Sequence, residues 1–263
     1  MRHNISTTIV EIDPAIYKAA RTFFGLPDPA NLFLEDARKW TAQRRAKIDA
    51  GHNEILFDIV VHDCFSGGGV PEHIYTLEFW SDLKAVMQSD GLLVVVSDHS
   101  VHLSYDSLIL REQNVVGVVK SESSKLIVNT LERSFGLCRA FHDLLDSFTE
   151  EKYNTEFINM VRLFMAQEKH LTSLSISQVL FCTQSSAPLS FREARKSDWL
   201  GSPLRQHVLQ SLDTREINLD SIRSAPGDDQ YILMDHNNPL GGLQEKQSNH
   251  HWFRMFLPII CQA

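Results

Sequence analysis

Acidic side chains follow three apolar runs of the sequence, each at the point where the run ends. Glu11 and Asp13 close the run TTIVEID, Asp36 closes NLFLED, and Asp63 closes FDIVVHD. A carboxylate offers two acceptor oxygens at the spacing of a diol, so an acid that ends a strand can hold both hydroxyls of a ribose. A lone acid in this position more often caps the next helix, as we expect of Asp13 before Pro14. Three such acids in the same register favour a shared binding site.

These acids can meet only if the apolar runs are strands of one sheet. The first half of the chain alternates such runs with amphipathic helical stretches, which is typical of an α/β fold with helices on both faces of a parallel sheet. Ligands of such sheets lie beyond the carboxyl ends of the strands. The expected strands are 7–13, 31–36, 57–63 and 91–96, and the expected helices are 14–25, 37–48 and 73–88.

The composition is that of a globular protein of 263 residues, with 43% hydrophobic and 22% charged residues. A net charge of -8 disfavours nucleic acid as a partner and suits a cationic substrate. No run approaches the roughly 20 apolar residues that cross a bilayer, so we expect a cytoplasmic chain without a membrane segment. The cysteines indicate neither a metal site nor a disulfide framework, because they are far apart and form no CxxC pair. They are Cys64, Cys138, Cys182 and Cys261.

The order of the motifs resembles the spermidine/spermine synthase family, which has the fold of class I S-adenosylmethionine-dependent methyltransferases. The resemblance covers residues 7–96 and is carried by IVEIDPAIYKAARTFFGLPDP, FLEDARKW, FDIVVHDCFSGGGVPEHIYTLEFW and SDGLLVVV. Later segments resemble the fungal members of the family. The resemblance implies transfer of an aminopropyl group from decarboxylated S-adenosylmethionine to a polyamine, with the donor as a co-substrate and no tightly bound cofactor or metal. A homodimer is one option, and some longer relatives are membrane-anchored.

The resemblance also implies roles for individual residues. Glu11 would hold the ribose, Asp36 the adenine amino group with Ala37 beside it, and Asp63 would bind and deprotonate the amine. Aminopropyltransferases carry DxxD after this strand, whereas this chain has Ser66 at the position of the second Asp. An unassisted serine is too weak a base for an ammonium, so Ser66 is expected to contact the substrate only. S-adenosylmethionine-dependent methyl transfer and an inactive family member are the alternatives.

The family's first strand and its glycine-rich turn should stand before residue 7, where this sequence has six residues. We therefore expect a sheet that lacks this strand, exposes an edge and binds its donor weakly. The run Gly67, Gly68 and Gly69 does not replace the turn, because it follows a later strand and lacks the spacing of a dinucleotide fingerprint.

Two insertions interrupt the family pattern, and they affect the domain boundaries that we expect. We expect a truncated Rossmann-like domain at 1–160, which contains an insertion at 96–113. The second part, 161–263, would hold the remainder of the sheet and a C-terminal extension, and it contains an insertion at 161–178. Each insertion has 18 residues, starts with Val and ends with Gln. Codons for Val begin with GT and a codon for Gln ends with AG, and these are the boundary signals of an intron. Retained introns and surface loops are alternative interpretations. As loops, the insertions should leave the sheet at strand ends.

Overall fold

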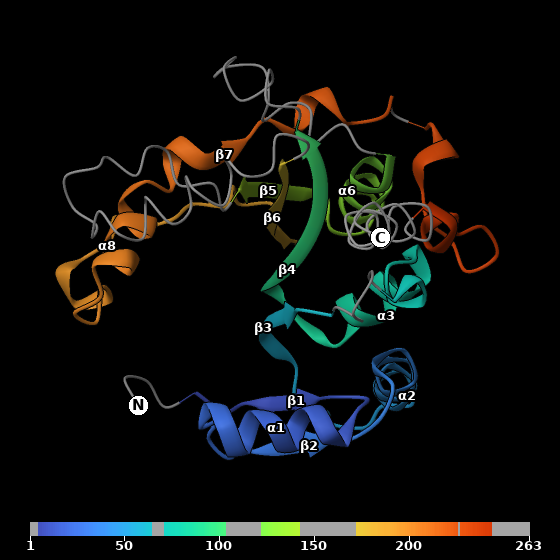
Figure 1. Cartoon of the computed structure of the whole chain (residues 1–263). Coiled ribbons are helices and arrows are strands. Elements are labelled where there is room, and N and C mark those ends of the chain that lie inside the picture. The colour runs from blue at the N-terminus through green and yellow to red at the C-terminus, as the bar shows by residue number, and fades with distance from the viewer. Residues whose placement is uncertain (1–4, 65–70, 104–121, 143–171, 226, 244–263) are drawn as a thin grey trace, which may run out of the picture.

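The computed structural model describes residues 5–64, 71–103, 122–142, 172–225 and 227–243 of the chain. The strands in these residues form a two-stranded and a five-stranded sheet (Figure 1). None of the helices in this part of the chain has the length and apolar character that a membrane crossing requires.

The two-stranded sheet belongs to a unit of alternating strands and helices. Its elements are β1 (Thr8–Val10), α1 (Pro14–Phe24), β2 (Asn31–Phe33) and α2 (Ala37–Asp49). The two strands pair in parallel. Each helix begins after an Asp that accepts a main-chain N–H of the first turn, Asp13 from Ala15 and Asp36 from Lys39. Such a cap satisfies an otherwise free N–H and places negative charge at the positive end of the helix dipole, which fixes where the helix starts.

The five-stranded sheet has the order β3-β4-β6-β5-β7. Strands β3 and β4 pair in parallel, whereas β6 runs antiparallel to both β4 and β5, and β7 antiparallel to β5. The strands are β3 (Phe57–His62), β4 (Met87–Leu103), β5 (Leu137–His142), β6 (Thr172–Thr183) and β7 (Glu216–Ile217).

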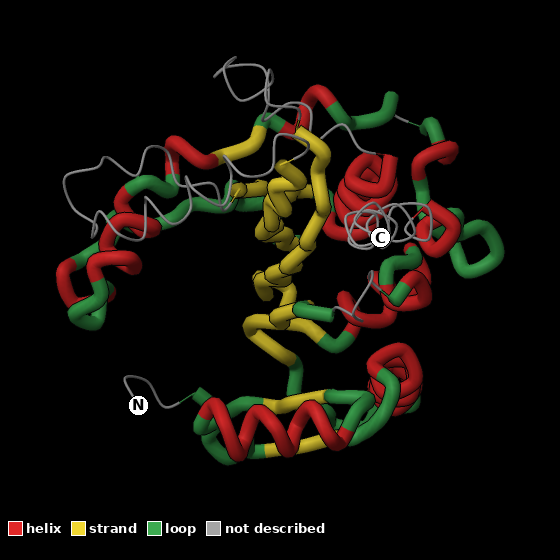
Figure 2. The backbone as a smooth tube through the Cα atoms, in the orientation of Figure 1, coloured by secondary structure: helices red, strands yellow, loops and turns green. Residues whose placement is uncertain are grey.

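Helices α3 (Leu77–Ala85) and α6 (Glu122–Phe135) lie on the same side of the five-stranded sheet (Figure 2). They pack against each other and against the strands, and α2 packs on α3. The core between them contains the aromatic side chains of Tyr75, Phe79 and Trp80, which are at most 2% exposed. The later part of the described chain contains α8 (Pro203–Gln210) and short 3-10 turns.

The predicted α/β class is confirmed, and the first strands and helices lie where the sequence predicts them, with shorter ends. The sheet is mixed rather than parallel, because the later strands pair antiparallel. The single helix expected at 73–88 is wrong. A 3-10 turn, η1 (Glu72–Ile74), comes first, then Thr76 accepts the Phe79 N–H and α3 begins.

Cys138 and Cys182 form a disulfide, contrary to the expectation that no disulfide is present. The two cysteines are directly opposite each other on β5 and β6, with their Cα atoms 4.2 Å apart, and both are buried. Their separation of 44 residues carries no information about strand pairing. Cys64 is a free, half-buried thiol.

Parts of the two interruptions pair with each other. Residues 97–103 of β4 form a continuous antiparallel ladder with residues 172–178 of β6. The expectation that the interruptions leave the sheet as loops is therefore wrong for these residues. Residues 104–113 and 161–171 lie outside the described part of the chain.

Candidate functional site

The three acids predicted to act together are positioned by three different elements. Glu11 directly follows β1, Asp36 directly precedes α2, and Asp63 directly follows β3. Asp63 is exposed, and the other two are partly buried. Short strands that end beside polar loops therefore carry the carboxylates to the surface of the protein.

The residues next to the three acids in the sequence, Val10, Ala37 and Cys64, line one pocket. Burial and, to a smaller extent, the negative charges of Asp63, Glu11 and Asp36 together raise the pKa of Cys64 to about 11. The effect of all three charges on one thiol agrees with their positions next to residues of the same pocket. The thiol is protonated at neutral pH and is not a nucleophile.

Asp36 is held by two partners. Its Oδ1 accepts the Lys39 N–H at 2.9 Å, and its Oδ2 lies 2.9 Å from His73 Nε2, which donates to it when that nitrogen carries a proton. Partial burial raises the pKa of Asp36, but the Lys39 N–H and His73 outweigh this effect and leave the pKa below its usual value. Asp36 is therefore ionised at neutral pH and can accept a hydrogen bond from a ligand. Ala37 follows it as the first residue of α2.

Glu11 is fixed within its own loop, because its Oε1 accepts the Asp13 N–H at 2.8 Å. Its main-chain N–H donates to Phe33 O of β2 at 3.0 Å, so the paired strands hold the residue in place. The carboxylate is thereby held beside Asp13, the cap of α1.

A polar network behind the acids connects α2 to a distant part of the chain. Arg38 donates to Thr76 Oγ1 at 2.8 Å and pairs with Asp235, and Thr76 Oγ1 donates to Asp235 Oδ1 at 2.6 Å. This network joins the first turn of α2 to the cap of α3. Asp235 belongs to a run, DHNNPLGG, that as sequence shows only turn chemistry.

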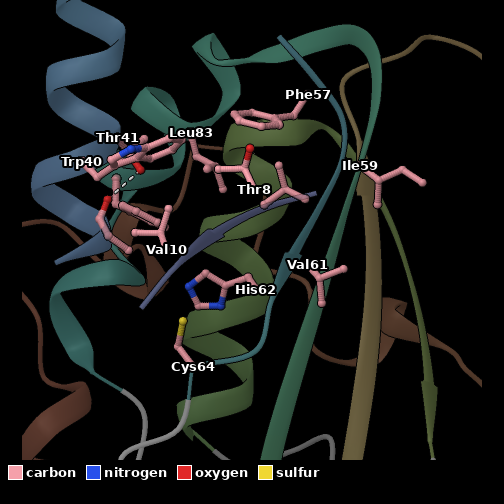
Figure 3. Close-up of a pocket in the computed structure, with 13 residues that line it drawn as sticks. Thr8, Val10, Trp40, Thr41, Phe57, Ile59, Val61, His62, Cys64 and Leu83 are labelled. Carbon is pink, nitrogen blue, oxygen red and sulfur yellow. Dashed lines mark hydrogen bonds between the residues drawn. The ribbon is translucent and has the colours of Figure 1, made fainter. Parts of the chain in front are cut away.

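A pocket lies between β1 and β3, beside the acids (Figure 3). Its cavity volume is about 160 Å³, and it is partly open to solvent. Its lining is mostly apolar and comes from β1, α2, β3 and α3 and from Cys64, which lies just beyond β3. The lining residues are Thr8, Val10, Ala37, Trp40, Thr41, Phe57, Ile59, Val60, Val61, His62, Cys64, Phe79 and Leu83.

His62, the last residue of β3, is a buried polar group at the pocket. Its side chain is 5% exposed and packs against the rings of Tyr75, Phe79 and Trp80. Neither ring nitrogen has a hydrogen-bond partner of ordinary geometry among the described residues. Burial lowers the pKa of His62 to about 4, against a smaller opposing effect of the His62 and Ile74 main chain. The ring is therefore neutral at pH 7.

Ser66 and the glycine run at 67–69 lie outside the described residues, so their predicted places are not located. Within the described ranges, no three His, Cys, Asp or Glu side chains are arranged to hold a metal ion. Of the predicted residues, the structure thus brings together Glu11, Asp36 and Asp63. It adds His73, whose Nε2 lies 2.9 Å from Asp36 Oδ2.

Comparisons with known proteins give one family model and two curated relatives. The family model described as spermine/spermidine synthase domain matches residues 1–134. An N-terminal histidine N-methyltransferase of Emericella nidulans is 28% identical over 264 residues, which is 97% of this chain and 39% of the relative. A polyamine aminopropyltransferase of Vibrio vulnificus is 34% identical over 87 residues, which is 33% of this chain and 27% of the relative. The chain thus spans well under half of either relative.

Among solved structures, a probable spermidine synthase from Corynebacterium glutamicum has a TM-score of 0.41 and 14% identity, covering 77% of this chain and 53% of that chain. A SAM-dependent methyltransferase from Archaeoglobus fulgidus has a TM-score of 0.36 and 17% identity, covering 68% of this chain and 76% of that chain.

Proposed function

Because the chain belongs to the spermine/spermidine synthase domain family, we propose that it is a transferase that moves an alkyl group from an S-adenosylmethionine-type donor to an amine. The observation that carries the proposal is that Glu11, Asp36 and Asp63 each adjoin a residue that lines one pocket, and that all three charges act on the Cys64 thiol there. Carboxylates at the ends of strands suit a donor with ribose hydroxyls and a positive sulfonium, and also a cationic acceptor.

Each acid would have a separate task. Glu11 would accept the ribose hydroxyls, and Asp36, which is kept ionised by Lys39 and His73, would accept the adenine amino group beside Ala37. Asp63, which is exposed, would bind the amine and take the proton that the attacking nitrogen sheds. The nitrogen lone pair would attack the carbon next to sulfur, and the carbon–sulfur bond would break, leaving its electrons on sulfur. Ser66 would contact the acceptor.

Methyl transfer is the first candidate reaction. The relative that aligns with 97% of this chain is an N-terminal histidine N-methyltransferase. The sequence also has Ser66 where an aminopropyltransferase pattern would have its second Asp. An acceptor with an exposed amine, such as the end of a peptide, would fit an acidic site on the protein surface.

Aminopropyl transfer is the second candidate, and one specific feature favours it. Three carboxylates around the site would repel the carboxylate of S-adenosylmethionine, whereas the decarboxylated donor has none. The relative from Vibrio vulnificus, a polyamine aminopropyltransferase, aligns with a third of the chain.

Donor binding tests the proposal before any acceptor is known. We expect S-adenosylmethionine, its decarboxylated form or methylthioadenosine to raise the melting temperature of the purified chain, because a ligand that binds only the folded state stabilises it. Mass spectrometry of a histidine-initiated peptide and of putrescine, each incubated with both donors, then distinguishes methyl from aminopropyl products. No stabilisation by any of the three nucleosides would overturn the proposal and favour an inactive family member.

A further inference from the structure

Residues 233–241, near the end of the described chain, lie along the start of α3 (Figure 1). Leu233, which is fully buried, accepts the Leu77 N–H at 2.8 Å through its main-chain oxygen. Glu78, in the first turn of α3, accepts the Asp235 N–H at 3.1 Å. The segment therefore has a fixed place at this end of the helix.

The same segment holds η1, which carries His73. Asn238 donates to Glu72 O at 2.8 Å, and Glu72 Oε2 accepts the Gly241 N–H at 2.9 Å. Gly241 approaches so closely that a Cβ atom there would collide with Glu72 Oε2. Glu72 is the first residue of η1 and His73 is the second. The position of His73 is thus fixed through its neighbour in the chain.

Arg38 connects this segment to the helix that Asp36 caps. Its guanidinium pairs with Asp235, donates to Thr76 Oγ1 at 2.8 Å and donates to His73 O at 3.5 Å. A guanidinium presents its donors in a fixed planar arrangement, so the carboxylate that pairs with it sets its orientation. Asp235 therefore determines how Arg38 holds the main chain of His73.

The orientation of Asp36 depends on these contacts. Its Oδ1 accepts the Lys39 N–H within α2, whereas its Oδ2 lies 2.9 Å from His73 Nε2, outside the helix. A shift of η1 would remove the second contact and leave the first. Recognition of a ligand requires a side chain that its surroundings hold within about 0.5 Å of the productive geometry.

The Asp235 side chain is 47% exposed, and that of Arg38 is 23% exposed. An ion pair near the surface usually stabilises a fold by less than about 1 kcal/mol. We therefore expect the loss of this pair to change the geometry of the site more than the stability of the chain.

We propose that Asp235 is a positioning residue for the donor, which acts through Arg38 and Thr76 to hold η1 so that His73 keeps Asp36 directed at the adenine amino group. The inference rests on the proposed function, in which Asp36 accepts that amino group. It gives a role in donor binding to a part of the chain beyond residues 1–134, which the family model matches.

Two nucleosides that differ at one position test the inference. Methylthioadenosine has the adenine amino group, whereas methylthioinosine has a carbonyl oxygen there, which cannot donate to Asp36. Isothermal titration calorimetry with the full-length chain measures both Kd values. We expect the wild type to prefer methylthioadenosine by about tenfold or more, the usual effect of a hydrogen bond to a charged group. In Asp235→Ala the preference should fall to about threefold or less, because a misplaced acceptor loses most of such a bond.

Two further variants separate positioning from general effects. Asp229→Ala removes another exposed ion pair of the same region, with Arg133 at 2.8 Å, and should keep the full preference. Gly241→Ala displaces the Glu72 carboxylate without a change of charge and should lower the preference as Asp235→Ala does. Circular dichroism checks folding, and Gly241→Ala decides if Asp235→Ala does not fold.

The outcomes distinguish this inference from the proposed function. If the wild type binds neither nucleoside, the proposed function fails and the inference fails with it. If the wild type binds both equally, or if Asp235→Ala keeps the full preference, only the inference is overturned. An equal loss of affinity for both nucleosides in Asp235→Ala also overturns it, since a general disturbance of the site gives that result.

Discussion

His73 Nε2 and Asp36 Oδ2 lie 2.9 Å apart, which links η1 to the start of α2. The contact joins residues 37 positions apart in the sequence. It gives Asp36 two simultaneous partners, a main-chain N–H in its own helix and a side chain from a neighbouring turn. A carboxylate held in this way has a fixed orientation toward a ligand.

Replacing His73 should therefore change how Asp36 titrates. In His73→Phe we expect the pKa of Asp36 to rise toward its ordinary value, because one of the groups that lower it is lost. A carboxyl whose folded pKa is lowered stabilises the fold above its unfolded pKa of 3.8, and this contribution is lost as pH falls through the folded pKa. NMR titration of Asp36 measures the change, and His52→Phe is the control. An unchanged Asp36 titration would show that the contact is unimportant.

The cap of α2 predicts a difference between two variants of Asp36. Asp36→Ala should lower the free energy of unfolding by about 1 kcal/mol, because the Lys39 N–H loses its acceptor. Asp36→Asn should lose much less, since Asn is an equally good cap. Urea denaturation measures both. Equal losses would mean that the charge, rather than the cap, stabilises the helix.

Buried, neutral His62 predicts a loss of stability in weak acid. Its pKa falls from 6.5 when unfolded to about 4 when folded, so the unfolded chain binds the proton first as pH falls. Stability from this residue is complete above pH 6.5 and should decline by about 3 kcal/mol by pH 4, at about 1.4 kcal/mol per unit. Unfolding of the wild type and of His62→Phe at several pH values measures it. Parallel pH profiles would contradict the prediction.

The cross-strand disulfide predicts a stability that depends on redox conditions. The bond closes a loop of 44 residues, which in the chain-entropy model stabilises the fold by about 4 kcal/mol. We expect reductant to lower the free energy of unfolding of the wild type but not of the Cys138→Ala, Cys182→Ala double variant. Peptide mapping without reductant should recover the two cysteines linked. Recovery of both as free, alkylated thiols would refute the bond.

Asp63 predicts the clearest effect on activity. If it accepts the proton of the attacking amine, Asp63→Asn should reduce turnover by about 100-fold or more, the usual contribution of a general base. Donor-induced stabilisation should persist, because Glu11 and Asp36 are intact. Asp58→Asn, at an exposed position of β3, is the matched control. Unchanged turnover would remove Asp63 from the reaction.

The local elements could be predicted from the sequence because each has a local cause. Pro14 after Asp13 marks the start of α1, and Asp36 marks the start of α2. Contacts between residues that are distant in the sequence could not be predicted in this way. The hydrophobic periodicity and the composition of a segment identify a strand but not the strand that pairs with it. The sequence therefore does not predict the disulfide between β5 and β6. For the same reason the sequence predicts Asp36 as a site residue but not its contact with His73.

The ladder between residues 97–103 and 172–178 makes two distant stretches of the gene dependent on each other. If either stretch were excised from the message, the other would lose its main-chain hydrogen-bond partners. The remaining strand would then have an exposed edge, which can pair with another copy of the chain. Splice forms or related genes should therefore keep both stretches or lose both.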